Sequence, residues 1–220
     1  MGALKGSMSV RRYAVTDALP TDVRKKLVRG VRAHAFAAID PKADLDVSVG
    51  WVSILDSEDT ELDANRCLFV GSDGEHLRIS MRVDVLKPSS AEVRRQLDTK
   101  VRVTEGEEGR PLSKRERREL KDEIARALRL RSVPRVRTFD VVWNLDTGRL
   151  YFWSQSKGTN ELFLDLFAKS FALRLSVEGP SMWARATVDA ATLTKLEPTA
   201  ELWHGFEGVR PLTSGIVEDN

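Results

Sequence analysis

The sequence has few of the features that mark redox, secreted or membrane proteins. Its 220 residues include one cysteine, Cys67, so no internal disulfide can form, and this residue lies in an apolar run typical of a core strand. No run approaches the roughly 18 consecutive apolar residues that a membrane-spanning helix needs, and the first residues lack the apolar core of a signal peptide. We therefore expect a soluble cytoplasmic protein that has no membrane partner.

Residues suited to metal or nucleophilic chemistry are also scarce. The three histidines, His34, His76 and His204, are far apart and show no zinc-binding spacing. No glycine-rich phosphate loop, dinucleotide fingerprint or serine-hydrolase elbow occurs. The acidic segment 56–63 could hold Mg²⁺ as in a nuclease, but its carboxylates crowd one polar loop, which favours a solvated loop. The sequence thus predicts a non-enzyme with no cofactor, metal site or catalytic residue.

Charge is abundant but nearly balanced, with 35 Lys and Arg against 33 Asp and Glu. Two segments nevertheless concentrate positive charge. Residues 1–36 hold eight basic residues against two acidic ones, and residues 110–137 hold eleven against four. A localised basic surface on a near-neutral chain is typical of polyanion binding, although ordinary solvated helix faces would explain the same charge. We expect the two segments to converge in the fold into one electropositive surface shaped for a double helix.

The second basic segment is predicted to form a helix whose sides differ in chemistry. Ser113 and Glu116 match a capping box, which specifies where the helix begins. At about 100° per residue, an apolar side and a separate basic stripe emerge. The apolar side comprises Leu120, Ile124, Ala127 and Leu128. The basic stripe comprises Lys114, Arg118, Lys121 and Arg129, flanked by Arg115 and Arg126.

Elsewhere the pattern alternates short strands with helices. Strands are expected at residues 7–15, 47–55, 67–71, 76–85, 138–145, 149–154 and 172–177, with hairpin turns at 72–75 and 146–148. Further helices are expected after the caps Thr21, Ser89 or Ser90, and Thr159 or Asn160, with a Gly- and Glu-rich break at 104–109 and a short helix at 188–196. This order predicts an α+β fold of largely antiparallel sheets with helices packed on them, and it could hold two similar halves.

Several short motifs occur in the same order as in one known family. They are Leu-Lys-Asp-Glu-Ile at 120–124, Val-Trp-Asn-Leu-Asp-Thr-Gly-Arg-Leu at 142–150, Ser156-Lys157, the helix at 161–171, Gly-Trp-Val at 50–52 and the opening residues 4–13. In these residues the chain resembles the recombination-associated RdgC family. The resemblance implies a non-enzymatic homodimer that closes into a ring with a positive channel, binds double-stranded DNA without sequence preference and antagonises recombinase filaments. Typical members have a longer C-terminal part, so an open clamp is the alternative to a ring.

Charge and resemblance together predict a sequence-independent DNA-binding homodimer, associated with the nucleoid and acting in recombination or replication. Residues 1–177 are expected to form the DNA-binding region, and residues 178–220 a C-terminal extension. The predicted DNA-binding residues are Arg24, Lys25, Arg29, Arg32, Lys114, Arg115, Arg118, Lys121, Arg129, Arg131, Arg135, Arg137 and Lys157. The alternative is an interaction module whose basic helices dock an acidic protein partner.

Overall fold

The structure, a computed structural model, describes residues 2–4, 9–19, 22–43, 45–62, 68–179 and 187–193. The expected cap Thr21 and the cysteine Cys67 lie outside these residues. The chain divides into two units, Met1–Glu178 and Gly179–Asn220. The described part of the second unit contains the short helix α6 (Ala190–Leu193), which falls within the segment where a helix was expected. The other elements belong to the first unit.

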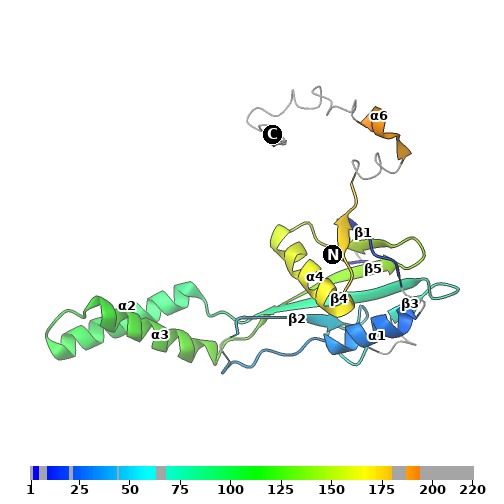
Figure 1. Cartoon of the computed structure of the whole chain (residues 1–220). Helices are drawn as coiled ribbons and strands as arrows, with labels where there is room; N and C mark the ends of the chain where they lie inside the picture. The colour runs from blue at the N-terminus through cyan, green and yellow to red at the C-terminus, as the bar shows by residue number, and fades with distance from the viewer. Residues whose placement is uncertain are drawn as a thin grey trace. The chain divides into compact units, whose positions relative to one another are not determined.

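The described strands form one antiparallel sheet (Figure 1). Its spatial order is β2 (Val47–Val52), β4 (His76–Val85), β5 (Arg135–Asn144), β6 (Arg149–Phe152), β1 (Arg11–Val15) and β7 (Leu175–Val177), with β3 (Phe69–Val70) also paired to β4. The expected α+β class is confirmed. Because β1 lies between β6 and β7, the two expected halves share one sheet and are not separate units.

The two expected hairpins are both present. Residues 145–148 connect β5 to β6, and Gly148 has a φ of 68°, a left-handed conformation that favours glycine. Residues 71–75 connect β3 to β4. One side of β4 is buried at Leu77, Ile79, Met81 and Val83. The opposite side is buried too, at Ser80, Arg82 and Asp84. The sheet is therefore covered on both faces along this strand.

Helices α1 (Val23–Ala33) and α4 (Lys157–Phe171) cover one face of the sheet (Figure 1). The core between them is rich in aromatic rings. Phe163 of α4 stacks on Phe152 of β6 with ring centroids 4.1 Å apart, and the indole of Trp51 donates to the Ser170 hydroxyl at 2.8 Å. Burial of such large apolar side chains is the main source of stability for this face.

The start of α4 differs from the prediction. The helix begins at Lys157 after Ser156, and Asn160 lies inside it rather than capping it. Asn160 is buried, accepts a hydrogen bond from the Tyr13 hydroxyl at 2.6 Å, and donates to the carbonyl oxygen of Ser154 at 3.1 Å. The amide is needed there because a buried tyrosine hydroxyl without a partner is costly. Sequence spacing alone does not reveal this long-range contact.

On the opposite face, an ion-paired arginine anchors the loops that cover β4. Arg82 is 8% exposed and donates to Asp84 at 2.8 Å and to Glu58 at 2.6 Å. Its guanidinium also lies 4.3 Å from the ring centroid of Phe36. The Asp84 hydrogen bond, followed by Glu58, raises the pKa of Arg82. Arg82 therefore ties the segments around residues 36 and 58 to the sheet.

Between β4 and β5 the chain forms a helical hairpin of α2 (Ser90–Glu108) and α3 (Lys114–Arg129), which projects from one end of the sheet (Figure 1). The expected break at 104–109 is wrong for residues 104–108, which continue α2 until Gly109. Glutamates favour helix, and Glu105 accepts from the backbone N–H of Leu112 at 2.9 Å, which fixes the turn that follows. The capping box of Ser113 and Glu116 is confirmed.

Candidate nucleic-acid interface

The cations of the hairpin fall into two groups. Six form ion pairs with carboxylates, and the others have no carboxylate partner among the residues that the structure describes. The paired cations are Arg95, Lys100, Arg110, Arg115, Arg117 and Arg129. Cations without such a pair are Lys87, Arg94, Arg102, Lys114, Arg118, Lys121 and Arg126. Only the second group can bind an external anion without first giving up an internal one.

Three unpaired cations form what we call the α3 stripe: Lys114, Arg118 and Lys121. They are spaced by four and three residues, which places them on one side of the helix, as the sequence predicted. All three are exposed. Arg115, predicted beside them, instead donates to Glu119 at 2.8 Å one turn further along. Among the described residues, the α3 stripe is therefore a row of positive charge without carboxylate partners, and Arg115 lies next to it already neutralised.

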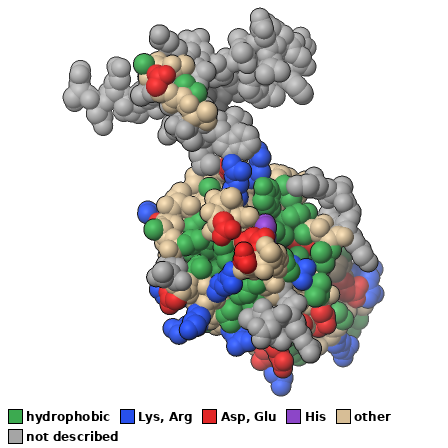
Figure 2. Space-filling model, turned by 90° about the vertical axis from the view of Figure 1, so that its right-hand side faces the viewer, with side chains coloured by type: hydrophobic (Ala, Val, Ile, Leu, Met, Phe, Trp, Pro, Cys, Tyr) green, Lys and Arg blue, Asp and Glu red, His purple; other side chains and the backbone are tan. Residues whose placement is uncertain are grey.

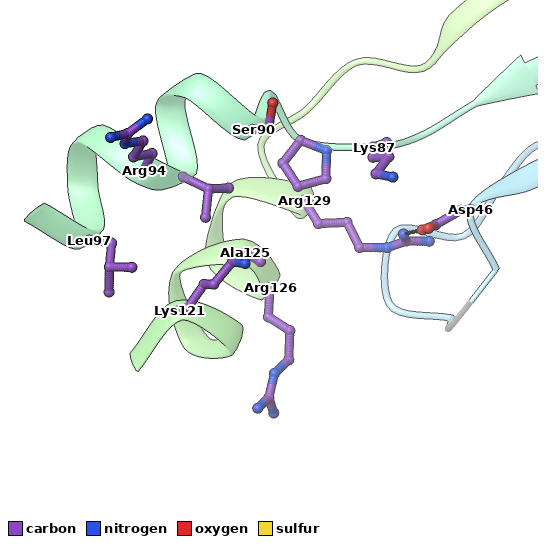
Figure 3. Close-up of a pocket in the computed structure, with 11 residues that line it drawn as sticks. Asp46, Lys87, Ser90, Arg94, Leu97, Lys121, Ala125, Arg126 and Arg129 are labelled. Carbon is purple, nitrogen blue, oxygen red and sulfur yellow. Dashed lines mark hydrogen bonds and ion pairs between the residues drawn. The ribbon is translucent and has the colours of Figure 1, made fainter. Parts of the chain in front are cut away.

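The α3 stripe leads into a groove of about 580 Å³ between α2 and α3 at the base of the hairpin (Figure 3). Its apolar floor is formed by Pro88, Val93, Leu97 and Ala125. Its cationic rim is formed by Lys87, Arg94, Lys121 and Arg126. Lys121 belongs to both the stripe and the rim, so the two features are continuous. Sequence reasoning missed Lys87 and Arg94, because nothing in the order of residues shows that they flank this groove.

Arg129 has a different role from the predicted one. Its guanidinium donates to the carbonyl oxygens of Leu45 at 2.6 Å and Leu86 at 3.1 Å, and it pairs with the carboxylate of Asp46. Figure 3 shows the side chain reaching away from α3 toward Asp46. The side chain is 13% exposed. We therefore correct the expectation that Arg129 faces phosphates, because it fastens α3 to the loop before β2.

Three more predicted residues lie near the end of the sheet from which the hairpin leaves. Arg131 lies two residues after the end of α3, and Arg135 and Arg137 are the first and third residues of β5, opposite Val85 and Val83. These three cations are exposed, and they extend the positive charge from the hairpin onto the adjoining end of the sheet. Lys157 is also exposed, but it begins α4 after β6, which ends opposite Val141 inside β5.

The basic residues of α1 lie elsewhere. Arg24 donates to the carbonyl oxygen of Asp73, just before β4, whereas Lys87 follows that strand. The ten residues of β4 span about 30 Å. Figure 2, which views the α1 end, shows Lys and Arg side chains interspersed with acidic and hydrophobic ones. The expectation that both basic segments converge within one protomer is therefore corrected. The four α1 cations predicted to bind DNA, Arg24, Lys25, Arg29 and Arg32, are all exposed.

The comparison with protein families adds an independent observation. Residues 9–192 match the model of the family described as "Putative exonuclease, RdgC". The chain belongs to the RdgC family. The matched range contains the whole sheet, the hairpin and α4. Membership of the RdgC family supports a recombination-associated DNA-binding role. No curated protein matches the chain.

The RdgC description also names an exonuclease, and hydrolysis by a nuclease commonly relies on clustered carboxylates that hold metal ions. Within the described residues, no group of three His, Cys, Asp or Glu is arranged to hold a metal. In the loop at 56–63, Asp56 and Asp59 accept from backbone N–H groups two residues on, and Glu58 pairs with Arg82. Asp63 and His204 lie outside the described residues. The carboxylates of Asp56, Glu58 and Asp59 therefore have structural roles in the loop.

None of the helices among the described residues has the length and apolar character needed to cross a membrane.

Proposed function

We propose that this chain binds double-stranded DNA without sequence preference through the α3 stripe, together with Lys87 and Arg94, and that it acts in recombination without cleaving DNA. The observation that carries the proposal is the segregation of cations on the hairpin. The α3 stripe is exposed and has no carboxylate partner in the part of the chain that the structure describes, whereas most other hairpin cations are neutralised by carboxylates. RdgC membership supports the coarser part of the proposal, a recombination-associated role in DNA binding.

Free cations suit this ligand because DNA binding of this kind is electrostatic. Each phosphate that a protein neutralises releases condensed counterions, and that release drives binding whatever the base sequence. A cation already paired within the protein gains less, because its carboxylate must be displaced. The cations Arg131, Arg135 and Arg137 continue the contact at the base of the hairpin. Nucleoid association and competition with a recombinase for DNA follow from occupying the duplex.

A homodimer, either a ring or a clamp, is part of the proposal. The basic segments are separated within one protomer by about the length of β4, so a single chain offers one projecting hairpin rather than a closed channel. Two copies would place two hairpins on one duplex. Light scattering with and without duplex DNA tests this part, with a dimeric mass expected and a monomeric complex contradicting it.

The decisive experiment is a salt titration of duplex DNA binding, followed by fluorescence anisotropy. The variant Lys114→Gln/Arg118→Gln/Lys121→Gln is expected to reduce the slope of log K against log salt by about two to three units, since each lost phosphate contact removes about 0.9. The matched control is Arg95→Gln/Lys100→Gln/Arg115→Gln, which removes the same charge from the same hairpin at ion-paired positions.

The control should change the slope by less than about one unit. Equal losses in both variants would mean that only net charge matters and would reject the α3 stripe as the interface. Two unrelated duplex sequences should give the same curves. Incubation of end-labelled DNA with Mg²⁺ or Mn²⁺ tests the absence of catalysis, and cleavage by the wild type that survives repurification would overturn it.

A further inference from the structure

The groove between α2 and α3 has an apolar floor, which phosphate binding does not require. DNA backbones present charge and sugar edges, so a purely electrostatic interface gains little from Val93, Leu97 and Ala125. We propose that this groove binds a segment of a partner protein in which acidic residues flank a bulky apolar side chain. The groove shares the rim cations Lys87, Arg94 and Lys121 with the proposed DNA contact, and the apolar floor is the feature that distinguishes this second ligand.

The floor is shaped to receive an apolar side chain. Val93 is 7% exposed, and Leu97 and Ala125 are half-buried, so the floor is partly covered but open from above. The small side chain of Ala125 leaves space between the helices. The volume of about 580 Å³ lies within the range of sites that bind small ligands or a few side chains. The floor can therefore bury one Leu or Phe side chain of a partner away from water.

The rim selects the charge of the occupant. Lys87, Arg94 and Lys121 have no carboxylate partner within the described part of the chain, and Arg126 donates only to the backbone carbonyl of Asp122. The single carboxylate of the lining, Asp46, is already bound to Arg129 (Figure 3). Four cations around an apolar floor are thus complementary to carboxylates around an apolar side chain.

The groove is also held in shape before a partner arrives. Arg129 links α3 to Asp46 and to the Leu86 carbonyl, and Leu86 is followed by Lys87 and Pro88 of the groove. The capping box at Ser113 and the contact of Arg117 with Glu105 at 2.7 Å fix the other end of the hairpin. A preformed groove loses little conformational entropy on binding, which favours a short linear segment as the ligand.

The test uses fluorescein-labelled decapeptides and the full chain. In the first peptide, Asp and Glu residues flank a central Leu-Phe pair. In the second, Asn and Gln replace the acidic residues, and in the third, two Ser replace Leu-Phe. We expect saturable binding of the first peptide, with the second and third each weaker by about tenfold or more, since truncating a pocket anchor typically costs this much.

Two variants with the same substitution locate the site. Ala125→Leu fills the groove and is expected to weaken the first peptide by about tenfold, whereas Ala127→Leu, on the exposed surface of α3 outside the groove, should change it by less than about twofold. Leucine is a good helix former at either position, so circular dichroism should show both variants folded. A third variant, Arg94→Glu, reverses one rim charge and leaves the floor unchanged. It should also weaken binding of the first peptide.

A comparison with DNA separates this proposal from the previous one. Lys114 and Arg118 lie outside the groove, so Lys114→Gln/Arg118→Gln should weaken duplex binding and leave peptide binding unchanged. Ala125→Leu should weaken peptide binding and leave duplex binding unchanged. Failure of the wild type to bind the first peptide overturns the groove proposal and leaves DNA binding intact. Equal binding of the first and third peptides also overturns it, because the floor would then be irrelevant.

Discussion

Arg129 and Asp46 join the helical hairpin to the sheet. Arg129 lies in the last turn of α3 and Asp46 immediately precedes β2, 83 positions earlier in the chain. The same guanidinium donates to the carbonyl oxygens of Ala43 at 3.0 Å and Pro41 at 3.1 Å. The α3 stripe lies on the helix that this contact holds, and the groove is lined by the same helix, so the contact helps to orient the candidate interface.

Replacement of Arg129 is expected to loosen the base of the hairpin. Arg129→Ala should lower the free energy of unfolding by about 2 to 3 kcal/mol, because several hydrogen bonds to a charged, largely buried group are lost. Arg129→Lys should lose less, since it keeps the charge without the planar fork. Urea denaturation measures the change, and limited proteolysis should show faster cleavage at residues 41–46. The neighbouring exposed Arg126→Ala is the control, with a change below about 0.5 kcal/mol; equal effects of both would contradict the anchoring role.

The role of Arg129 illustrates what sequence patterns do and do not predict here. The capping box at Ser113, the α3 stripe and the turn at Gly148 depend on neighbours within a few residues, and the structure contains all three. Arg129 falls on the same helical stripe as Lys121, and helix periodicity cannot distinguish a free cation from one bound to a distant loop. The roles of residues that make long-range contacts could therefore be assigned only from the folded structure.

For the same reason the groove was not predicted. Its rim takes Lys87 from the end of β4, Arg94 from α2 and Lys121 from α3, which only the antiparallel packing of the hairpin brings together. The separation of α1 from the hairpin likewise follows from strand order, because α1 contacts the β3–β4 turn and the hairpin leaves the opposite end of β4.

The capping box gives the hairpin a defined response to acid. Hydrogen bonds from Arg110 and then Ser113 hold the pKa of Glu116 at about 2, below its ordinary value of 4.5. A carboxylate whose pKa is lower in the folded state stabilises the fold above about pH 4.5, and this contribution is lost as the pH falls toward 2. We expect the difference in melting temperature between wild type and Glu116→Gln to be largest at neutral pH and to shrink on acidification.

Thermal unfolding followed by circular dichroism across this pH range checks the prediction. Glu107→Gln is the control, because Glu107 is exposed on α2 and has no partner within the described residues. Parallel melting curves for wild type and Glu116→Gln at all pH values would contradict the assigned role. Independently, Ser113→Ala should lower stability by about 1 kcal/mol through loss of the N-cap.

Two helical glycines should respond in opposite directions to the same substitution. A Cβ at Gly30 in α1 would press against the backbone carbonyl of Ser170 and the ring of Phe171, so Gly30→Ala should destabilise the fold by about 1 to 3 kcal/mol. At Gly106 in α2 a Cβ would meet no atom within 4 Å. Gly106→Ala should therefore stabilise the protein by up to about 1 kcal/mol. Urea denaturation of both variants measures this, and a stabilised Gly30→Ala would refute the close approach of α1 to α4.

The last prediction asks whether α1 shares in DNA binding. Lys25→Gln/Arg29→Gln/Arg32→Gln removes three exposed cations, the same number as the α3 stripe variant, from a helix that begins about one strand length away from the groove. If the hairpin is the interface, this variant should lower the slope of log K against log salt by less than about one unit, against about two to three for the α3 stripe. A loss as large as that of the α3 stripe would place α1 on the duplex. Since one protomer separates the two basic segments, such a loss would require that a second copy presents its α1 beside the first copy's hairpin, and it would reject an interface made by the hairpin alone.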